Sequence, residues 1–340
     1  MKFVTFGEIM MRLQPEGYKR ISQAESFDLC FGGSEANVAV SLANFGEEAV
    51  FLTKIPDSLI GDRCLRDLKA NGVDTSAIVL GGPRMGIYFT EKGASQRAST
   101  CIYDRAGSSI TTLKKKEINF KKLFAGAAWF HTSGITPALG KDVADLTVAL
   151  MKAAKEKGLK TSCDLNYRKK LWTKEEANKV MTACMPYTDV LIANEEDVSD
   201  VFGLHADGTN IVGGKLSEQG YIDLGRKVLD CFPSLSYVAF TLRESFSASK
   251  NGWSGLLVSR TNAVRSKRYE LDVIDRVGGG DSFSAGLIYA LATGMDDSAA
   301  INFGIAASAL KHSIEGDYNR VSVAEVTKLA LGDGSGRIQR

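Results

Sequence analysis

Short apolar runs and longer amphipathic runs alternate along most of the chain. Residues 2–7 and 49–55 are short apolar runs rich in β-branched side chains, which are typical of buried strands. Residues 35–46 and 62–72 carry apolar positions at helical spacing. Further strands are predicted at residues 127–132, 159–164, 189–194 and 237–242. Strands that alternate with helices form a parallel sheet covered on both faces, so the pattern predicts a doubly wound α/β fold.

Two segments interrupt this alternation, at about residues 11–31 and 85–110. In the second segment, residues 87–92 and 98–105 resemble strands joined by polar turns, with no helix between them. We expect a single α/β domain of 340 residues with a separate small sheet that projects as a lid. Exposed sheet edges tend to be paired or covered, so we also expect the lid to join copies of the chain into a homo-oligomer.

The composition points to a small molecule as the main partner. Hydrophobic residues make up 44% of the chain and charged residues 24%, with a formal net charge of only +2. No basic stripe or acidic tail is present, which argues against nucleic acid or a membrane surface as the partner. The N-terminus lacks the apolar core of a signal peptide, so a cytoplasmic protein is expected. The six cysteines form no C-x-x-C pair, which favours reduced thiols.

Three consecutive glycines stand directly before a predicted helix. Gly278, Gly279 and Gly280 precede Asp281, and residues 282–291 have helical periodicity. Free backbone N–H groups and the positive end of the helix dipole can bind phosphate oxygens at such a position. A tight turn with Asp281 as an ordinary N-cap explains the same residues, so the glycines alone leave both interpretations open.

Two glycine motifs and one acidic motif resemble those of a known family. Residues 275–283, DRVGGGDSF, are similar to the C-terminal signature D-T-x-G-A-G-D-x-F of the ribokinase-like carbohydrate kinases of the phosphofructokinase-B type. Residues 32–37, GGSEAN, are similar to the N-terminal signature of that family. Residues 194–197, NEED, match its magnesium motif N-x-x-E except that Asp197 is shorter. The resemblance implies a ribokinase-like three-layer αβα fold with a mostly parallel sheet and a β-sheet lid.

The resemblance also implies a catalytic mechanism. Asp281 would accept the proton of a sugar hydroxyl while that oxygen attacks the γ-phosphorus of ATP. The amides of Gly278, Gly279 and Gly280 would stabilise the charge on the transferred group. No G-x-x-x-x-G-K-[ST] motif is present, so a P-loop kinase is not expected.

The metal ions are likewise implied by the resemblance. Mg²⁺ would be bound by Asn194 and, through water, by Asp197. A monovalent cation, K⁺, would lie beside Asp275.

The nucleotide side departs from the family pattern. Family members carry T-x-G-x-x-G after the strand that ends here at Thr241, but Arg243 replaces the first glycine. Arg243 either contacts a phosphate or is an ordinary solvated arginine. The nucleotide-binding residues implied by the resemblance are Asn166, Asn194, Thr241, Arg243, Gly278, Gly280, Ala307, Lys311 and Asn319.

The acceptor is predicted to be a sugar acid. Fructose kinases of this family carry G-E-x-x-x-D where residues 7–12 read GEIMMR, so Arg12 replaces the acid. Residues 134–139, 164–172 and 103–105 resemble those of 2-keto-3-deoxygluconate kinases. The substrate-binding residues implied by that resemblance are Gly33, Asn37, Tyr88, Tyr103, Arg105 and Arg168.

Arg105 and Arg168 would lie at the carboxylate of such a substrate, because an arginine fork binds a carboxylate through two parallel hydrogen bonds. Surface ion pairs remain the alternative for both arginines. The expected activity is ATP-dependent phosphorylation of the C6 hydroxyl of 2-keto-3-deoxy-D-gluconate. The alternatives are a kinase for the galactonate epimer or for fructose, and a non-catalytic sugar-acid sensor.

Overall fold

A large sheet forms the centre of the computed structural model, which describes residues 1–205, 217–332 and 334. Among these residues the sheet has ten strands in the order β13-β12-β11-β10-β9-β8-β1-β4-β5, with β14 beside β12. The strands are β1 (Lys2–Phe6), β4 (Glu48–Ile55), β5 (Ile78–Leu80), β8 (Ala127–Ser133), β9 (Lys160–Asp164), β10 (Val190–Ala193), β11 (Tyr237–Ser245), β12 (Lys250–Val258), β13 (Ala263–Arg265) and β14 (Tyr269–Asp272). The ladders from β5 to β11 are parallel, whereas those of β12 are antiparallel.

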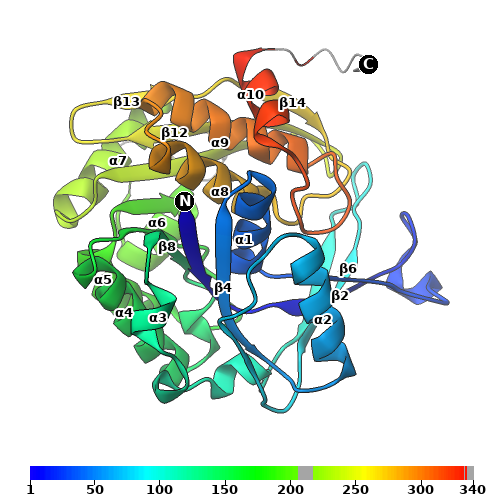
Figure 1. Cartoon of the computed structure of the whole chain (residues 1–340). Coiled ribbons are helices and arrows are strands. Elements are labelled where there is room, and N and C mark those ends of the chain that lie inside the picture. The colour runs from blue at the N-terminus through cyan, green and yellow to red at the C-terminus, as the bar shows by residue number, and fades with distance from the viewer. Residues whose placement is uncertain (206–216, 333, 335–340) are drawn as a thin grey trace.

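Helices cover both faces of this sheet (Figure 1). One face is covered by α1 (Ser34–Asn44), α2 (Leu59–Ala70), α8 (Gly279–Ala292), α9 (Asp297–Lys311) and α10 (Val323–Leu331). The other is covered by α3 (Phe120–Leu123), α4 (Lys141–Glu156), α5 (Lys174–Cys184), α6 (Glu195–Phe202) and α7 (Glu218–Cys231). Short 3₁₀ turns occur at Ile21–Gln23, Ser109–Thr112, Lys115–Glu117, Pro137–Leu139 and Met185–Tyr187.

Successive strand residues supply the two cores in turn. In β1, Phe3 packs with α1, α8 and α9, whereas Val4 and Phe6 pack with the helices of the opposite face. In β4, Phe51 packs in the same core as Phe3, and Leu52 packs in the same core as Val4 and Phe6. Because side chains alternate along a strand and both faces are buried, these strands have continuous apolar runs. The predicted three-layer, doubly wound α/β fold is confirmed.

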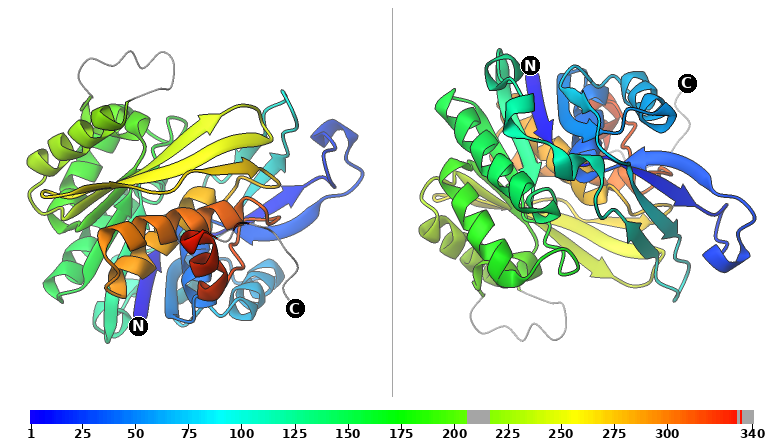
Figure 2. Two further views of the ribbon diagram at one scale, coloured as in Figure 1. Left: turned by 90° about the horizontal axis from the view of Figure 1, so that it is seen from above. Right: turned by 90° about the horizontal axis from the view of Figure 1, so that it is seen from below.

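A second, four-stranded sheet stands apart from the main one. Its order is β3-β2-β6-β7, formed by β2 (Met10–Gln14), β3 (Asp28–Gly32), β6 (Gly86–Glu91) and β7 (Thr100–Asp104). Figure 2 shows these blue and cyan strands reaching beyond the helices on one side of the molecule. The predicted small sheet is therefore present, and the bounds of β6 and β7 lie within two residues of the strands predicted at residues 87–92 and 98–105. Its roles as lid and as dimer surface remain predictions.

The strand predicted at residues 237–242 is longer than expected, and the conformation after Thr241, which the sequence left open, is extended. No glycine loop begins there, because β11 continues to Ser245 and pairs with β12 in an antiparallel ladder. Arg243 is opposite Trp253 in this ladder. Continued strand pairing satisfies the backbone groups that a loop would leave exposed, and it explains why glycine is absent at position 243.

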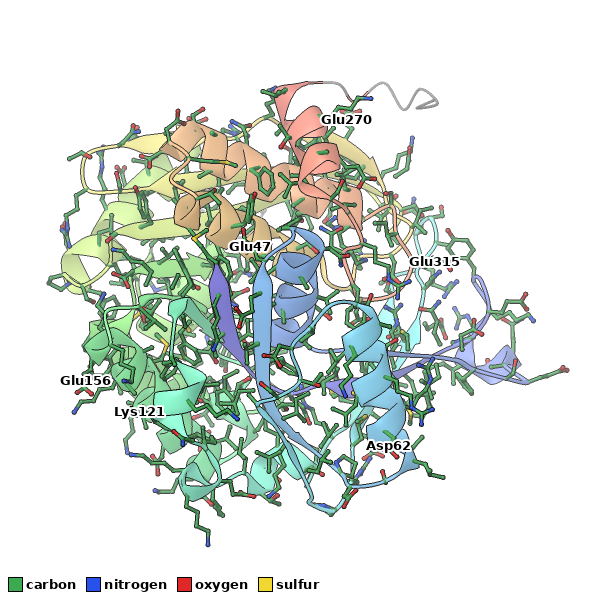
Figure 3. All side chains as sticks on the ribbon, viewed as in Figure 1. Glu47, Asp62, Lys121, Glu156, Glu270 and Glu315 are labelled. Carbon is green, nitrogen blue, oxygen red and sulfur yellow. The ribbon has the colours of Figure 1, made fainter. Side chains whose placement is uncertain are left out.

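Charged side chains of both signs lie around the outside of the molecule. Figure 3 labels Asp62 on α2, Lys121 on α3, Glu156 on α4 and Glu270 on β14, all of which are exposed. In the described part of the chain, no helix has the length and apolarity needed to cross a bilayer. The presence of exposed charges of both signs is consistent with the small formal net charge of +2.

Candidate active site

The three glycines form the turn into α8. Gly278 has φ +83°, and a Cβ there would lie 2.1 Å from the carbonyl oxygen of Asp317. A Cβ on Gly279 would lie 2.5 Å from the ring of His312. Gly280 is different, because a Cβ there meets no atom within 4 Å. Packing requires the first two glycines, whereas the third leaves the N-terminus of α8 open to an anion.

Asp281 lies in the first turn of α8 and is held by the first turn of α1. Ser34 Oγ donates to Asp281 Oδ1 at 2.8 Å, and Asn37 Nδ2 donates to Oδ2 at 2.7 Å. Burial raises the pKa of the Asp281 carboxyl, while these two hydrogen bonds lower it by stabilising the ionised form. The two glycine signatures meet here, and Ser34 joins the site although the sequence analysis did not single it out.

Close packing fixes the start of α1. Gly33 is extended, and a Cβ there would lie 1.9 Å from the carbonyl oxygen of Glu8. Glu35 is buried and accepts hydrogen bonds from Ser133 N and Oγ at 2.8 Å and from Thr136 Oγ1 at 2.7 Å. Burial raises the pKa of Glu35 to about 6. These contacts tie α1 to the end of β8 and so orient the side chains that hold Asp281.

Two further acids lie near Asp281. Asp164 ends β9, and Asp197 lies in the first turn of α6, where its Oδ1 accepts a hydrogen bond from Tyr167 N at 3.2 Å. Burial raises the pKa of Asp197 to about 6. Burial, and then the charges of Asp197 and Asp281, raise the pKa of Asp164 well above its usual value. None of the three acids forms an ion pair within the described ranges, so this part of the site has an excess of negative charge.

This acidic group fits a magnesium ion that binds together with a nucleotide. Mg²⁺ prefers oxygen ligands and commonly takes one or two carboxylates plus phosphate oxygens and water. In residues 1–205, 217–332 and 334, no set of three acidic, histidine or cysteine side chains could hold a metal alone. Asn194 caps α6 by accepting a hydrogen bond from Asp197 N at 2.7 Å. Asp197 and Asp164 are therefore better placed than Asn194 to supply the ligands.

Asn166 joins the group that holds Asp281. Its Nδ2 donates to Ser34 Oγ at 3.4 Å, and its backbone has φ +38°, a conformation that asparagine tolerates better than most residues. Thr241 and Arg243 lie on β11, where Thr241 is half-buried and Arg243 is exposed. The structure thus links Asn166 to Asp281 through Ser34 and leaves the Arg243 side chain accessible.

The remaining nucleotide candidates lie on α9 or in the segment that follows it. Ala307, Lys311 and Asn319 are 0%, 0% and 1% exposed. Asn319 Nδ2 donates to the carbonyl oxygen of Ala307 at 3.0 Å. The structure does not present these three side chains to a nucleotide.

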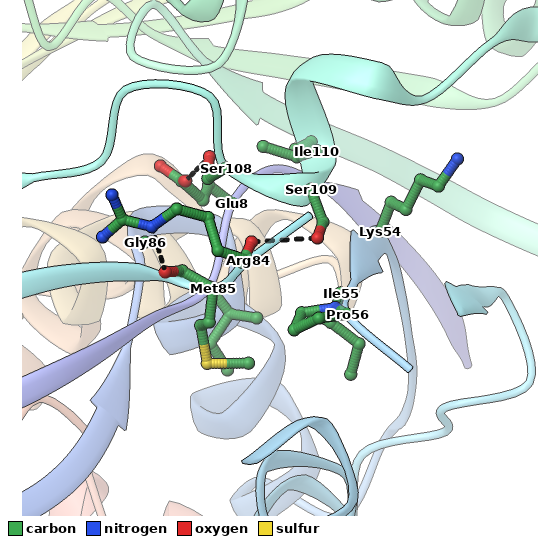
Figure 4. Close-up of a pocket in the computed structure, with 11 residues that line it drawn as sticks. Glu8, Lys54, Ile55, Pro56, Arg84, Met85, Gly86, Ser108, Ser109 and Ile110 are labelled. Atoms are coloured by element: carbon green, nitrogen blue, oxygen red, sulfur yellow. Dashed lines mark hydrogen bonds between the residues drawn. The ribbon is translucent and has the colours of Figure 1, made fainter. Parts of the chain in front are cut away.

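The substrate candidates from the lid contact one another. The rings of Tyr88 and Tyr103 stack with their centroids 5.7 Å apart, and the guanidinium of Arg105 lies 5.7 Å from the Tyr103 centroid. Arg105 donates to Glu8 through Nε at 2.8 Å and also through Nη2. Ser108 donates to the other oxygen of Glu8, at the edge of the pocket in Figure 4. Glu8, which the sequence analysis quoted but did not assign, therefore binds the fork expected to hold the substrate carboxylate.

Arg168 is the exposed member of the predicted arginine pair. Its Nη1 donates a hydrogen bond to the carbonyl oxygen of Tyr167 at 3.3 Å. Its positive charge counteracts the burial that raises the pKa values of Asp197, Asp281 and Tyr103. Arg168 thus acts electrostatically on both the lid and the acids, and it has no ion pair in the described part of the chain.

Arg12 has a structural environment that the sequence did not reveal. Its guanidinium is buried and donates to Asp275 Oδ2 at 2.6 Å and to Asp317 Oδ1 at 2.8 Å. Tyr88 also donates to Asp317, at 2.6 Å to both oxygens. The arginine that replaces the acid of fructose kinases therefore binds the chain's own carboxylates and does not face a substrate.

Comparison with known proteins identifies the family. Residues 1–227 and 246–322 match the model of the pfkB family carbohydrate kinases. A crystal structure of 2-dehydro-3-deoxygluconokinase from Thermotoga maritima is 48% identical, with a TM-score of 0.94, and covers 98% of this chain and 100% of that chain.

Two curated relatives also match over nearly their full lengths. A 2-dehydro-3-deoxygalactonokinase from Haloferax volcanii is 32% identical over 335 residues, which are 98% of each chain. A 2-dehydro-3-deoxygluconokinase from Bacillus subtilis is 28% identical over 331 residues, covering 95% of this chain and 93% of the relative.

Proposed function

Since the chain belongs to the pfkB family of carbohydrate kinases, we propose that it transfers the γ-phosphoryl group of ATP to the C6 hydroxyl of 2-keto-3-deoxy-D-gluconate. The observation that carries this proposal is the position of Asp281. Its carboxylate is oriented by Ser34 and Asn37 at the open N-terminus of α8, within the electrostatic reach of the exposed Arg168.

The proposed reaction is an in-line displacement. Asp281 accepts the proton of the C6 hydroxyl as that oxygen bonds to the γ-phosphorus and the bond from phosphorus to the ADP oxygen breaks. Amides of the turn formed by Gly278, Gly279 and Gly280 stabilise the charge on the phosphoryl oxygens. The open space beside Gly280 supports this role, because a Cβ there meets no protein atom within 4 Å.

Magnesium completes the charge balance of the nucleotide site. When bound, the ion neutralises negative charge on the phosphates of ATP. Asp197 and Asp164 are the residues that would hold it, and Asn194 orients Asp197 through the cap of α6. A bound cation would also relieve the repulsion between the acids.

Arg168 supports a sugar acid as the acceptor. An exposed guanidinium without an acidic partner in the described ranges suits a carboxylate, whereas fructose offers none. The charge of Arg168 also acts on Tyr103, whereas Arg105 is bound to Glu8. The galactonate epimer is the second candidate, favoured by the 32% identity to the Haloferax volcanii enzyme. It also carries a carboxylate, so Arg168 does not distinguish the two acids.

The test measures ADP release with Mg-ATP on 2-keto-3-deoxygluconate, its galactonate epimer, fructose, ribose and gluconate. We expect turnover only on the two keto acids. Replacing Arg168 by alanine should raise the KM for the keto acid about 10- to 100-fold, the value of a charged hydrogen bond, and leave the KM for ATP unchanged. Lys169→Ala, at the exposed neighbouring position, is the matched control.

Other outcomes would reject parts of this proposal. Preference for fructose would reject the sugar acid and the role of Arg168, while the kinase activity would stand. Binding of a keto acid without turnover on any acceptor would favour a sugar-acid sensor.

A further inference from the structure

A buried lysine lies directly beneath the glycine turn. Lys311 is the last residue of α9 and is 0% exposed. Its Nζ donates to the carbonyl oxygen of Asp275 at 3.4 Å and to that of Ile314 at 3.1 Å. Asp275 starts the segment that leads into the turn, and Gly278 lies close by, since a Cβ added there would be 3.2 Å from Lys311 Cε. One ammonium group thus joins the segment before α8 to the loop after α9.

The charges around Lys311 are balanced. Arg12 and Lys311 supply two positive charges, and Asp275 and Asp317 supply two negative ones. All four side chains are less than 5% exposed. Burying an unpaired charge is costly, whereas a paired group of this kind is stable only while it stays complete.

The oxygens of Asp275 already have donors. Val277 N donates to its Oδ1 at 3.1 Å, while Arg12 Nη2 and Gly316 N donate to its Oδ2 at 2.6 and 3.1 Å. Its carbonyl oxygen accepts from Lys311. The family resemblance implies a monovalent cation beside Asp275, but these residues do not fit one, because an added ion would meet occupied oxygens and unbalance the buried charge.

We propose that the Lys311 ammonium is a built-in cation that holds the glycine turn, so that the protein requires no added K⁺. An ammonium is a compact charge with three donors, and like a metal ion it can gather backbone carbonyl oxygens around one point. Because it is covalently attached, its occupancy does not depend on the ion concentration. It positions the backbone of the Asp275–Gly278 segment and touches no substrate. The effect on turnover rests on the proposed kinase function, whereas the effect on ion binding does not.

The test compares the wild type with Lys311→Ala in KCl, NH₄Cl and choline chloride at one ionic strength. The variant retains the carbonyl oxygens and gains space and one net negative charge. We expect K⁺ or NH₄⁺, but not choline, to raise its Tm by about 2–4 °C and its kcat by about tenfold. Wild-type Tm and kcat should be the same in all three salts.

Lys92→Ala is the matched control. Lys92 is also buried and forms an ion pair with Glu315 in the loop after α9. It is not a donor to the carbonyl oxygens of Asp275 and Ile314, which Lys311 binds. This control should show no dependence on the cation. Glu315, which is labelled in Figure 3, is exposed.

Two results would overturn the proposal. One is saturable activation or stabilisation of the wild type by K⁺ relative to choline. The other is a folded Lys311→Ala protein whose Tm is the same in all three salts. If the alanine variant folds only in KCl or NH₄Cl, the proposal is supported; if it folds in none, the wild-type salt comparison decides. Tm reports on ion binding even if no sugar acid is phosphorylated. Failure of the proposed kinase function can therefore be distinguished from failure of the proposal about Lys311.

Discussion

Two groups of charged side chains flank the start of α8, and they differ in charge balance. Arg12, Lys311, Asp275 and Asp317 are buried and pair with one another or with backbone groups. On the other side, Asp164, Asp197 and Asp281 have no ion pair in the described part of the chain, and burial raises the pKa of each.

The difference separates a structural role from a functional one. The balanced group is complete without a ligand and holds the turn and the lid together. The acidic group keeps an electrostatic cost that a bound cation would relieve, which is typical of a functional site. Removing a charge should therefore affect mainly stability in the first group and mainly chemistry in the second.

The largest effect should come from Asp281→Asn, which removes the proposed base and keeps the shape. We expect kcat to fall about 10³-fold, as is usual for the loss of a general base. Calorimetric affinities for ATP and the keto acid should stay unchanged, and the unfolding free energy should not fall, because one of three repelling charges is lost. Asp62→Asn on the exposed face of α2 serves as the control. An equal loss of binding would contradict the base role.

Arg12→Met tests the balanced group. It leaves the buried carboxylates of Asp275 and Asp317 with Lys311 alone, so we expect the free energy of unfolding in urea to fall by about 3–5 kcal/mol. Arg84→Met is the control, because its partner Asp104 is 55% exposed and such a surface pair contributes about 0–1 kcal/mol. A loss of activity without a loss of stability would assign Arg12 to the substrate site. It would contradict the structural role of the balanced group.

A smaller effect should appear in the pH dependence of stability. The pKa of Asp197 is about 6 in the folded protein against an ordinary value of 3.8. The folded state therefore binds the proton more tightly, so this group makes stability fall as pH rises from about 4 to about 6, by up to about 3 kcal/mol. Asp197→Asn should remove that part of the fall.

The pKa of Glu35 is also about 6, so Glu35 contributes to the pH dependence of the unfolding free energy in both the wild type and Asp197→Asn. The quantity to compare is the difference between the slopes of these two proteins. Urea unfolding from pH 4 to 7 measures each slope. Equal slopes would show that Asp197 does not have the raised pKa that distinguishes the acidic group.

Much of the fold could be predicted because strand and helix patterns are local. Residues 2–7 and 49–55 show the apolar runs of strands buried on both faces, and the two interrupting segments contain the strands of the small sheet. The predicted end of β11 was wrong, because the pairing of Arg243 with Trp253 depends on β12, which no local pattern around residue 241 specifies.

The site was only partly predictable for the same reason. Asp281 and Asn37 stand in recognisable motifs, and the structure brings them within hydrogen-bonding distance. Ser34, Glu8 and Asp317 were missed, because their importance comes from partners far away in the sequence. A single acid or serine without its partner has no distinguishing pattern.

The sequence by itself determined the layered α/β architecture, the small sheet and the glycine-led helix with its acid, since periodicity and glycine spacing constrain the nearby backbone. Only the tertiary structure decided which charges are already paired. It bound Arg12 to two carboxylates, Arg105 to Glu8 and Lys311 to backbone carbonyls, and it left Arg168 exposed. The physical reason is that the strength of a charge interaction depends on distance and burial, and both are set by segments that meet only after folding.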